Sequence, residues 1–436
     1  MLSAFRNAFK IADLRNKILF TLAVIAVYRL GSHIPLPGVD FEQVQNLQRQ
    51  AEQGGSIVNL INLFSGGALT NFAIFALGIM PYITSSIIMQ LLAVVIPRLE
   101  ALQKEGEVGR KKITQYTRYM TVVLSLLQSL GIIVTANSGN LFGSFGAAQP
   151  LGDFFPDRSI VNIGIVVLTL TAGTALIMWL GELITQRGIG NGMSILIFAS
   201  IISSLPAQAT SLWVTARPAK GSVFLLLGLA IVVTVVTVEQ AQRRIPVQYA
   251  KRVVGRRTYG GQSTYIPMKV NQAGVIPIIF ASSLLYLPVL ASTIVGREWL
   301  SEFVNKHFAL QGGFSPIYVI TYFVLIIAFT YFYTAITFNP ADVADNIKKY
   351  GGFIPGIRPG KPTADYLAYT LTRITLPGAV FLGVIAVMPF LAQGLWNITS
   401  FPFAGAAVLI IVGVGLETMK QIESQLMTRD YEGFLR

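Results

Sequence analysis

Long apolar stretches separated by short polar segments dominate the chain. They fall at about 18–35, 72–96, 119–137, 160–180, 191–205, 221–238, 272–295, 316–338, 374–395 and 402–419. A helix that spans a membrane needs about 20 mostly apolar residues. The pattern therefore predicts an all-α polytopic membrane protein with ten transmembrane helices.

The basic residues between these stretches indicate the orientation. If the N-terminus is cytoplasmic, the cytoplasmic segments carry 26 Lys or Arg and the external segments carry six. Lys and Arg accumulate in cytoplasmic loops, so we expect both termini in the cytoplasm. The same bias explains a net charge of +13 in a membrane protein. The first apolar run lacks the cleavage site of a signal peptide, and we interpret it as the first span.

An even number of spans suggests two halves. Residues 1–205 hold spans one to five, and residues 206–436 hold spans six to ten. Five spans in each half give the halves opposite topologies, as in inverted-repeat membrane proteins. No clear sequence repeat accompanies this division, so it rests on the count and the orientation.

The composition excludes several kinds of chemistry. The chain has no cysteine, which excludes disulfides, thiolate catalysis and cysteine-ligated metal. Its two histidines, His33 and His307, lie far apart in the sequence, which argues against a histidine metal site. The sequence contains neither a P-loop nor a Rossmann fingerprint. We therefore expect no metal, no cofactor and no nucleotide site in this chain.

Charged residues are nearly absent from the middle of the spans. Arg29, Glu182, Glu239 and Glu417 all lie near span ends. Ion-coupled transporters usually need ionisable residues inside the bundle. The pattern thus favours a passive channel over a secondary transporter of small solutes. An intramembrane enzyme would need a Ser–His or paired-Asp site at membrane depth, and the sequence offers no candidate.

Some apolar segments do not have the pattern of ordinary spans. The stretch 57–64 is too short to cross a membrane. It is either an amphipathic helix on the external surface or an element folded back into the bundle. Pro81 is expected to kink the second span, and the seventh span opens with a similar polar, Gly and Pro pattern at 271–280. Two kinked helices suggest moving parts, although polar residues in such helices often only contact neighbouring helices.

Two cytoplasmic loops carry more pattern than topology requires. The loop at 239–271 has β-branched and aromatic residues around Gly255, Arg256 and Arg257, which is typical of a protruding hairpin. The loop at 339–373 places two prolines and three glycines near Arg358. Basic loops of this kind either enforce topology alone or bind a partner such as ribosomal RNA or an acidic protein surface. The shaped tips favour docking.

The order of specific motifs identifies a resemblance to the SecY family over nearly the whole chain. These motifs are Ser32-His-Ile-Pro-Leu-Pro-Gly-Val-Asp40, Asn62-Leu-Phe-Ser-Gly-Gly-Ala-Leu69, Phe75-Ala-Leu-Gly-Ile-Met-Pro-Tyr-Ile83, Lys104-Glu-Gly-Glu-Val-Gly-Arg-Lys-Lys112, Gln115-Tyr-Thr-Arg118, Arg187-Gly-Ile-Gly-Asn-Gly192, Arg243-Arg-Ile-Pro-Val-Gln-Tyr-Ala250, Ala273-Gly-Val-Ile-Pro277, Phe338-Asn-Pro340, Ala344-Asp-Asn346 and Gly356-Ile-Arg-Pro-Gly360. The resemblance implies a protein-conducting channel. Such a channel passes unfolded secretory polypeptides across a membrane and releases apolar segments sideways into it.

The resemblance also implies roles for residues in the spans. The family's pore ring corresponds to Ile79, Ile83, Met193, Ile197, Ile279 and Ile410. Met193 replaces the branched aliphatic residue expected there, which keeps that position apolar but makes it more flexible. The segment at about 57–71 resembles the family's short re-entrant plug helix, and its plug residues would be Ile61, Phe64, Ser65, Gly66 and Gly67.

Spans two and seven resemble the two sides of the family's lateral gate. Its polar contacts would be Thr84, Gln90 and Asn271, and partner docking would rest on Arg358, followed by Arg256 and Arg257. The resemblance implies SecE-like and SecG-like small membrane subunits, the SecA ATPase and the ribosome as partners. It also implies secretory and membrane-protein precursors as substrates, and the bacterial plasma (inner) membrane as the surrounding bilayer. A partner would supply the energy.

Overall fold

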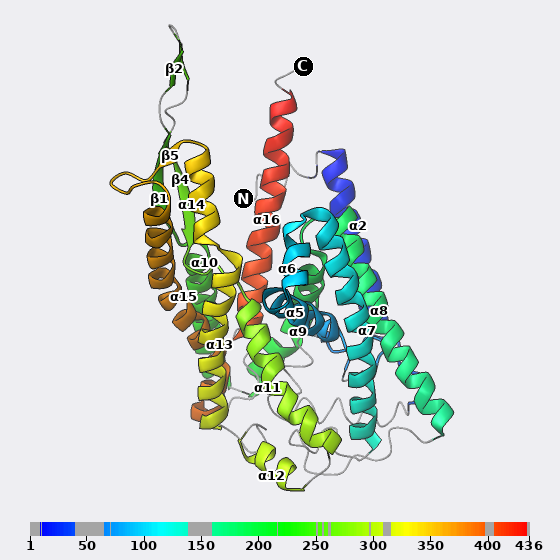
Figure 1. Cartoon of the computed structure of the whole chain (residues 1–436). Coiled ribbons are helices and arrows are strands. Elements are labelled where there is room, and N and C mark those ends of the chain that lie inside the picture. Colours follow the sequence, from blue (N-terminus) through cyan, green and yellow to red (C-terminus); the bar gives the residue numbers. More distant parts are fainter. Residues whose placement is uncertain are drawn as a thin grey trace.

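The structure is a computed structural model of the whole chain (Figure 1). It describes residues 9, 11–39, 65–69, 71–137, 159–215, 217–249, 252–254, 257–259, 263–295, 298–307, 315–396 and 405–433. The predicted plug residues Ile61 and Phe64 and the predicted docking residue Arg256 lie outside this part of the chain.

Each of the ten predicted apolar stretches contains a helix. These helices are α2 (Ala12–Gly31), α5 (Met80–Val95), α7 (Glu107–Asn137), α8 (Ile160–Arg187), α9 (Gly192–Thr215), α10 (Arg217–Gln240), α11 (Ile276–Val295), α13 (Pro316–Thr337), α15 (Lys361–Trp396) and α16 (Ala406–Gly433). Three shorter helices are α6 (Pro97–Lys104), α12 (Glu298–His307) and α14 (Pro340–Lys349). The all-α prediction is confirmed, and the helices are consistent with ten spans.

Not every helix is long enough to be recognised as a span by itself. Within the described residues, three helices pass a test of length and apolar composition, and they begin at Ile160, Pro316 and Lys361. The pair α5 and α6 passes as a fourth span although it bends by 101° at Ile96. Shorter apolar helices include 192–206 and 226–240. Length and apolar composition alone therefore do not identify every helix of this bundle, and the contacts between neighbouring helices are needed as well.

The starts of two helices correct the predicted kinks. Pro81 lies in the first turn of α5, which begins at Met80, and Pro277 is the second residue of α11. A proline in the first turn costs no helical hydrogen bond, because that N–H has no partner within the helix. The prediction that these prolines kink their spans is wrong, since both begin a helix.

The helices pack into two groups that contact each other along two lines. In the first group α5 packs on α7, α7 on α8, and α8 on α9, while in the second α11 packs on α13 and α13 on α15. Between the groups, α9 contacts α10 and α16, and α11 contacts α5 and α7. One large apolar core runs through both groups, from Val24 in α2 to Val414 in α16.

A small sheet projects from one end of the bundle. Strands β1 (Gln242–Tyr249), β4 (Ser263–Lys269) and β5 (Gly352–Phe353) form an antiparallel sheet in the order β4-β1-β5, and β2 (Arg252–Val254) pairs with β3 (Arg257–Tyr259). Figure 1 shows this hairpin at the same end of the molecule as the start of α2 and the end of α16, with α12 at the opposite end. The structure thus contains the hairpin predicted in 239–271.

The two basic loops form one unit with its own apolar core. Pairing of Gln248 with Phe353 and of Tyr249 with Gly352 joins β1 to β5. The buried residues of this core are Ile245, Val247, Met268, Ile347, Ile354, Leu367 and Leu371. They come from β1, β4, α14, the turn after β5, and α15. No pattern in the sequence indicates that the two loops pack together.

Candidate functional site

Six apolar residues predicted for the pore ring belong to one apolar cluster. Ile79, Met193, Ile197, Ile279 and Ile410 are buried members, and Ile83 is a half-buried residue packed against them. The exposed fraction is 1% for Ile79 and Ile410 and 8% for Met193. The six residues come from the start and first turns of α5, from α9, α11 and α16. The structure therefore gathers side chains from both groups of helices.

Local packing explains how a methionine fits in this cluster. Met193 and Ile197 lie one helical turn apart on α9, so they share a face. A Cβ added at Gly181 of α8 would lie 2.1 Å from the sulfur of Met193. Only a glycine at position 181 leaves room for the side chain of Met193 in this position.

The described part of the predicted plug is a glycine turn that contacts α2. Gly66 and Gly67 have φ angles of 64° and 86°, which side chains other than glycine rarely adopt. The Nη1 atom of Arg29 donates a hydrogen bond to the Gly66 carbonyl oxygen over 2.9 Å. Ser65 is buried, with an exposed fraction of 2%. The structure thus places Ser65, Gly66 and Gly67 against the bundle.

The segment after this turn is tied to the end of α2. The Leu36 N–H donates to the Phe72 carbonyl over 2.8 Å, and the Ile74 N–H donates to the Ile34 carbonyl over 3.0 Å. These bonds flank an antiparallel bridge between Pro35 and Ala73. The beginning of the predicted second span, 72–79, is therefore extended and turn structure rather than helix.

The structure does not pair the three predicted gate residues with one another. Thr84 donates to the carbonyl of Met80 over 2.9 Å, within its own helix. Gln90 is exposed and donates to Ser86 over 3.4 Å. Asn271 is buried, with an exposed fraction of 3%. The helices α5 and α11 nevertheless contact each other across the two groups.

Asn271 binds a glutamate that follows the sixth apolar stretch. Its Nδ2 atom donates to Oε1 of Glu239 over 2.6 Å and to the Gly274 carbonyl over 3.2 Å. The buried Oδ1 atom of Asn271 has no hydrogen-bond partner. Burial raises the pKa of the Glu239 carboxyl, and the hydrogen bond from Asn271 opposes this rise. Asn271 thus connects the end of α10 to the start of α11.

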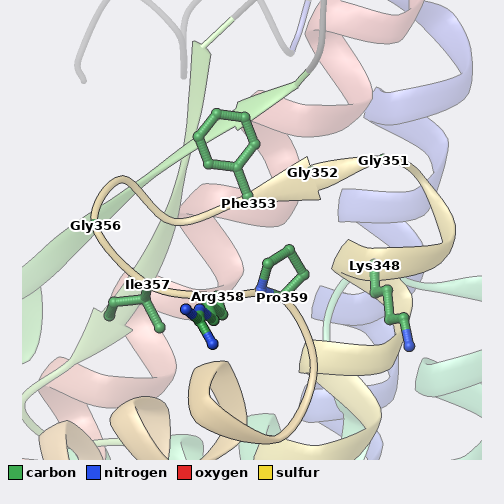
Figure 2. A pocket seen from close by; sticks show the side chains of 8 residues that line it. All are labelled: Lys348, Gly351, Gly352, Phe353, Gly356, Ile357, Arg358 and Pro359. Carbon is green, nitrogen blue, oxygen red and sulfur yellow. The ribbon is translucent and has the colours of Figure 1, made fainter.

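Arg358 lies exposed at the rim of an open hollow beside the sheet. The hollow has a volume of about 570 Å³, and Figure 2 shows it between the end of α14 and the loop that follows β5. Its lining residues are Lys348, Gly351, Gly352, Phe353, Gly356, Ile357, Arg358 and Pro359. The Thr363 hydroxyl donates to the Arg358 carbonyl over 2.9 Å. This bond fixes the backbone that presents the guanidinium.

The predicted docking residue Arg257 lies on the hairpin. The backbone of Arg257 pairs with Val254 at the start of β3. Because β2 and β3 continue the projection of β1 and β4 (Figure 1), the hairpin and the Arg358 loop belong to the same end of the molecule. Pairing of β1 with β5 holds the bases of the two loops together.

Two polar contacts in the bundle were not predicted from the sequence. One is the bond from Arg29 to Gly66. The other joins α7 to α8, where Nε of Arg118 donates to Oε1 of Glu182 over 2.7 Å in a two-pronged ion pair. Arg118 ends the motif Gln115-Tyr-Thr-Arg118, and Arg29 lies near the end of the first span, but nothing in the sequence indicates which residue each one binds.

The helices, the shared apolar core and the single basic end define a multi-pass helical membrane protein. A family model described as SecY matches residues 73–419. The protein translocase subunit SecY of Streptomyces galbus is 57% identical over the full length of both chains. That of Mycobacterium tuberculosis strain H37Rv is 54% identical, again over both full lengths. The chain belongs to the SecY family.

Solved structures share this fold at low sequence identity. One described as a protein conducting channel aligns with a TM-score of 0.62 and 17% identity over 94% of this chain and 92% of that chain. One in which the plug domain of the SecY protein is described as stabilising the closed state has the same TM-score, identity and coverage. Sec61 in the canine ribosome-channel complex from the endoplasmic reticulum gives a TM-score of 0.59 and 15% identity, with 94% and 92% coverage.

Proposed function

We propose that this chain forms the channel through which unfolded polypeptides cross a membrane. The observation that carries the proposal is the apolar cluster in which Ile79, Ile83, Met193, Ile197, Ile279 and Ile410 meet. Membership of the SecY family supports it, because the relatives are named protein translocase subunits. The family consists of channels rather than known enzymes, so the chain acts passively.

A ring of bulky apolar side chains suits a protein channel. Ions that enter it lose hydration and gain no polar contacts in exchange, so the ring resists ion leakage. A passing polypeptide meets only weak contacts without sequence preference. The ring closes around such a chain as a gasket. The burial of five of the six residues in the isolated chain fits a closed ring.

The proposal also assigns a plug and a lateral gate to this channel. Ile61, Phe64, Ser65, Gly66 and Gly67 block the closed channel from outside. Separation of α5 from α11 opens a path toward lipid, with Thr84, Gln90 and Asn271 as polar gate residues. An apolar segment then partitions into the bilayer, driven by burial worth about 25 cal/mol per Å². The contact between α5 and α11 supports this assignment.

The basic end of the molecule is the proposed docking site. Arg358 is the principal contact, and Arg256 and Arg257 contribute from the hairpin. The ribosome and the SecA ATPase bind there and supply energy, while SecE-like and SecG-like subunits accompany the chain in the membrane. Similarity to a channel in a ribosome complex supports the ribosome as a partner.

The proposed location is the bacterial plasma membrane, with both termini in the cytoplasm. The distribution of Lys and Arg supports this orientation. The start of α2, the end of α16 and the basic sheet lie at one end of the molecule (Figure 1), as the orientation requires. The external side then holds α12.

Cysteine crosslinking tests the pore ring directly, because the chain has no cysteine of its own. We would place one cysteine at Ile79, Ile197 or Ile410, stall a secretory precursor that carries its own cysteine, and measure disulfide formation. Leu168→Cys and Ile320→Cys are matched controls, since these side chains are 67% and 63% exposed on α8 and α13.

The two outcomes are distinct. Crosslinks at the three ring positions, and few at the controls, would place the polypeptide inside the ring. Equal crosslinking at ring and control positions, with the precursor demonstrably engaged, would reject either the ring assignment or protein conduction. Precursor transport by the same cysteine variants separates these two alternatives.

A further inference from the structure

The short helix α12 carries a ladder of aromatic rings on one face. Trp299, Phe303 and His307 follow one another at intervals of four residues, so their side chains lie along the same side of the helix. The ring centroids of Trp299 and Phe303 are 6.2 Å apart, and those of Phe303 and His307 are 4.8 Å apart. Polar residues such as Glu302 and Lys306 occupy other positions of the helix. An apolar side and a polar side make α12 amphipathic.

The rest of the chain covers only part of the apolar side. Val304 is buried, with an exposed fraction of 1%, whereas Trp299 is 74% exposed and Phe303 is 46% exposed. Successive residues of a helix lie roughly 100° apart around its axis, so Val304 and Phe303 face different directions. Glu302, on the other side of Phe303, is exposed as well. The helix therefore rests on its neighbours along one edge of its apolar side and presents the aromatic edge outward.

The position of α12 is fixed between two helices of the bundle. It contacts α11, and Figure 1 shows it near the ends of α11 and α13, at the end of the molecule opposite the basic sheet. Ser315, the N-cap of α13, donates from its hydroxyl to the His307 carbonyl over 3.1 Å and accepts from the Tyr318 N–H over 3.5 Å. Tyr318 in turn packs on Phe390 of α15, with 5.3 Å between the ring centroids. The C-terminal end of α12 is thus tied to the start of α13.

The membrane surface is the neighbour that this position supplies. The helix that begins at Pro316 is long and apolar enough to span a membrane, and Ile317 and Ile320 in its first turns are exposed, as lipid-facing side chains are. Because α12 is bonded to the start of this span, its exposed rings lie close to a surface that lipid covers. Tryptophan collects at membrane–water interfaces, and amphipathic helices lie there with their apolar face at the boundary between headgroups and acyl chains.

From these observations we propose that α12 is an interfacial anchor, with Trp299 and Phe303 inserted into the headgroup boundary of the lipid leaflet at this end of the molecule. The anchor fixes the depth of the ends of α11 and α13, which it joins. The helix holds two acidic residues and one basic residue, so burial of its rings rather than attraction to anionic lipid drives the contact. The proposal requires only that the chain spans a membrane, and it is independent of the channel function.

Depth-dependent fluorescence quenching tests this anchor. The chain has four tryptophans, so replacing all but one by phenylalanine gives single-tryptophan versions of the full chain. These are reconstituted in vesicles of phosphatidylglycerol and phosphatidylcholine, the latter brominated either near the glycerol or near the end of the acyl chain. When only Trp299 is kept, we expect the shallow bromine to quench about twofold more than the deep one, and aqueous acrylamide to quench little.

Trp179 supplies the deep control for this measurement. It is exposed and lies within α8, which is long and apolar enough to span a membrane. When only Trp179 is kept, the deep bromine should quench at least as strongly as the shallow one. The comparison shows that the two bromines distinguish depths in the same vesicles.

Two neighbouring substitutions separate the aromatic edge of α12 from its polar side. In the version that keeps only Trp299, Phe303→Gln removes the stacked ring from the lipid boundary, so quenching of Trp299 by acrylamide should rise about twofold or more. Glu302→Gln introduces the same side chain one position away, on the polar side. It should leave quenching by lipid and by acrylamide as in the parent.

Spin labels give an independent measurement in a chain that keeps all its tryptophans. Because the chain has no cysteine, Phe303→Cys and Glu302→Cys each accept a single nitroxide. We expect oxygen, which concentrates in lipid, to relax the label at position 303 more strongly, and a water-soluble nickel chelate to relax the label at position 302 more strongly. This measurement decides the matter if the single-tryptophan versions do not fold.

Three results would overturn the proposal. Strong quenching of Trp299 by acrylamide, with none by brominated lipid, would mean that α12 lies in water. Quenching by neither would mean that another protein or a second copy of the chain covers the rings. Equal access of the nickel chelate to positions 302 and 303 would mean that the two sides of α12 meet the same surroundings. Precursor transport is not a readout here, so a failure of the channel function would leave each of these results unchanged.

Discussion

Ile83 and Ile279 occupy the same place in two copies of one local structure. The Ile83 N–H donates to the Ile79 carbonyl over 3.1 Å, and the Ile279 N–H donates to the Val275 carbonyl over 3.4 Å. In both copies the N–H of the preceding residue donates to that same carbonyl. Each isoleucine is also a member of the apolar cluster proposed as the pore ring.

The sequence before each isoleucine produces this shared structure. Gly78 and Gly274 have φ angles of 58° and 61°, and each is followed three residues later by a proline, Pro81 or Pro277. Glycine permits the left-handed conformation, and proline is preorganised for the first turn of a helix. A matching start for α5 and α11 is expected if the two proposed halves are related by an inverted repeat.

Because Ile83 and Ile279 occupy equivalent positions, the same substitution at each should change resting ion flux to a similar extent. Ile83→Ser and Ile279→Ser each place one hydroxyl in the apolar ring, which makes the ring easier to wet. We expect both variants to raise resting ion flux through reconstituted vesicles several-fold and to similar extents. Leu168→Ser, on the exposed side of α8, is the control. A large rise in only one ring variant would show that the two halves do not contribute equally to the seal.

Met193 of α9 packs directly against Gly181 of α8, so the effect of a substitution at one position should depend on the residue at the other. Gly181→Ala would place a Cβ 2.1 Å from the Met193 sulfur, so the methionine has to move out of its position. Overpacking of this kind typically costs about 1–3 kcal/mol. We expect a lower midpoint of thermal unfolding for Gly181→Ala and substantial recovery in Gly181→Ala with Met193→Ala. No recovery in the double variant would mean that backbone contacts at position 181, rather than Met193, require glycine.

The parts of the fold that sequence predicts well are those set by length and periodicity. Apolar stretches of span length gave the positions of all ten bundle helices, because a bilayer requires such lengths. The β-branched and aromatic residues around Gly255 indicate the hairpin. The predicted kink at Pro81 is wrong because the same sequence pattern fits two structures. A proline can bend the interior of a helix, or it can lie in the first turn of one. Only the neighbouring residues at positions 71–79, held against α2, decide between them.

Contacts between distant segments could not be predicted in the same way. The pairing of β5 with β1 involves a strand of two residues, too short for any recognisable pattern. The partner of Arg29 is a backbone carbonyl, which carries no residue type that a sequence displays. Asn271 was predicted to be a gate contact from resemblance alone, whereas its side chain binds Glu239 in its own half.

Charge at the proposed docking site predicts a position-specific loss of binding. Arg358→Glu and Lys349→Glu change the net charge equally, and both residues are exposed, but only Arg358 lines the hollow beside β5. If Arg358 is a principal contact, its reversal should weaken binding of purified ribosomes or of SecA by about tenfold or more. Lys349→Glu should have a smaller effect that disappears at high salt. Equal losses in the two variants would indicate general attraction to a basic surface.

The packing of the two cytoplasmic loops predicts a shared stability. A Cβ at Gly352 would lie 2.9 Å from the Tyr249 ring and 3.0 Å from Ile347. Gly352→Val should therefore separate β5 from β1 and destabilise the small cytoplasmic core by about 1–3 kcal/mol. Hydrogen exchange measures this as faster exchange of the β1 amides near Tyr249, with bundle amides unchanged. Unchanged exchange in β1 would mean that the loops are independent.

The buried carboxyl of Glu239 predicts a pH-dependent contribution to stability. Burial raises its pKa above the usual value for glutamate, while Asn271, Lys269 and Lys420 oppose the rise. The folded chain thus holds this proton more tightly than the unfolded chain does. The stabilisation that Glu239 adds to the folded chain is therefore fully present below the pKa of the unfolded state. It is lost as the pH rises through the higher pKa of the folded state.

Glu239→Gln keeps the shape of the side chain but has no proton to lose, so it should avoid the cost of a buried charge. We expect the variant to unfold at a higher temperature than the parent near pH 8, with the difference shrinking toward zero near pH 4. Thermal unfolding of the purified complex across this pH range measures the effect. Glu105→Gln, at an exposed glutamate after α6, controls for the change in net charge. A Glu239→Gln variant less stable than the parent at pH 8 would mean that the ionised carboxyl is held by Asn271 and the two lysines strongly enough to outweigh its burial.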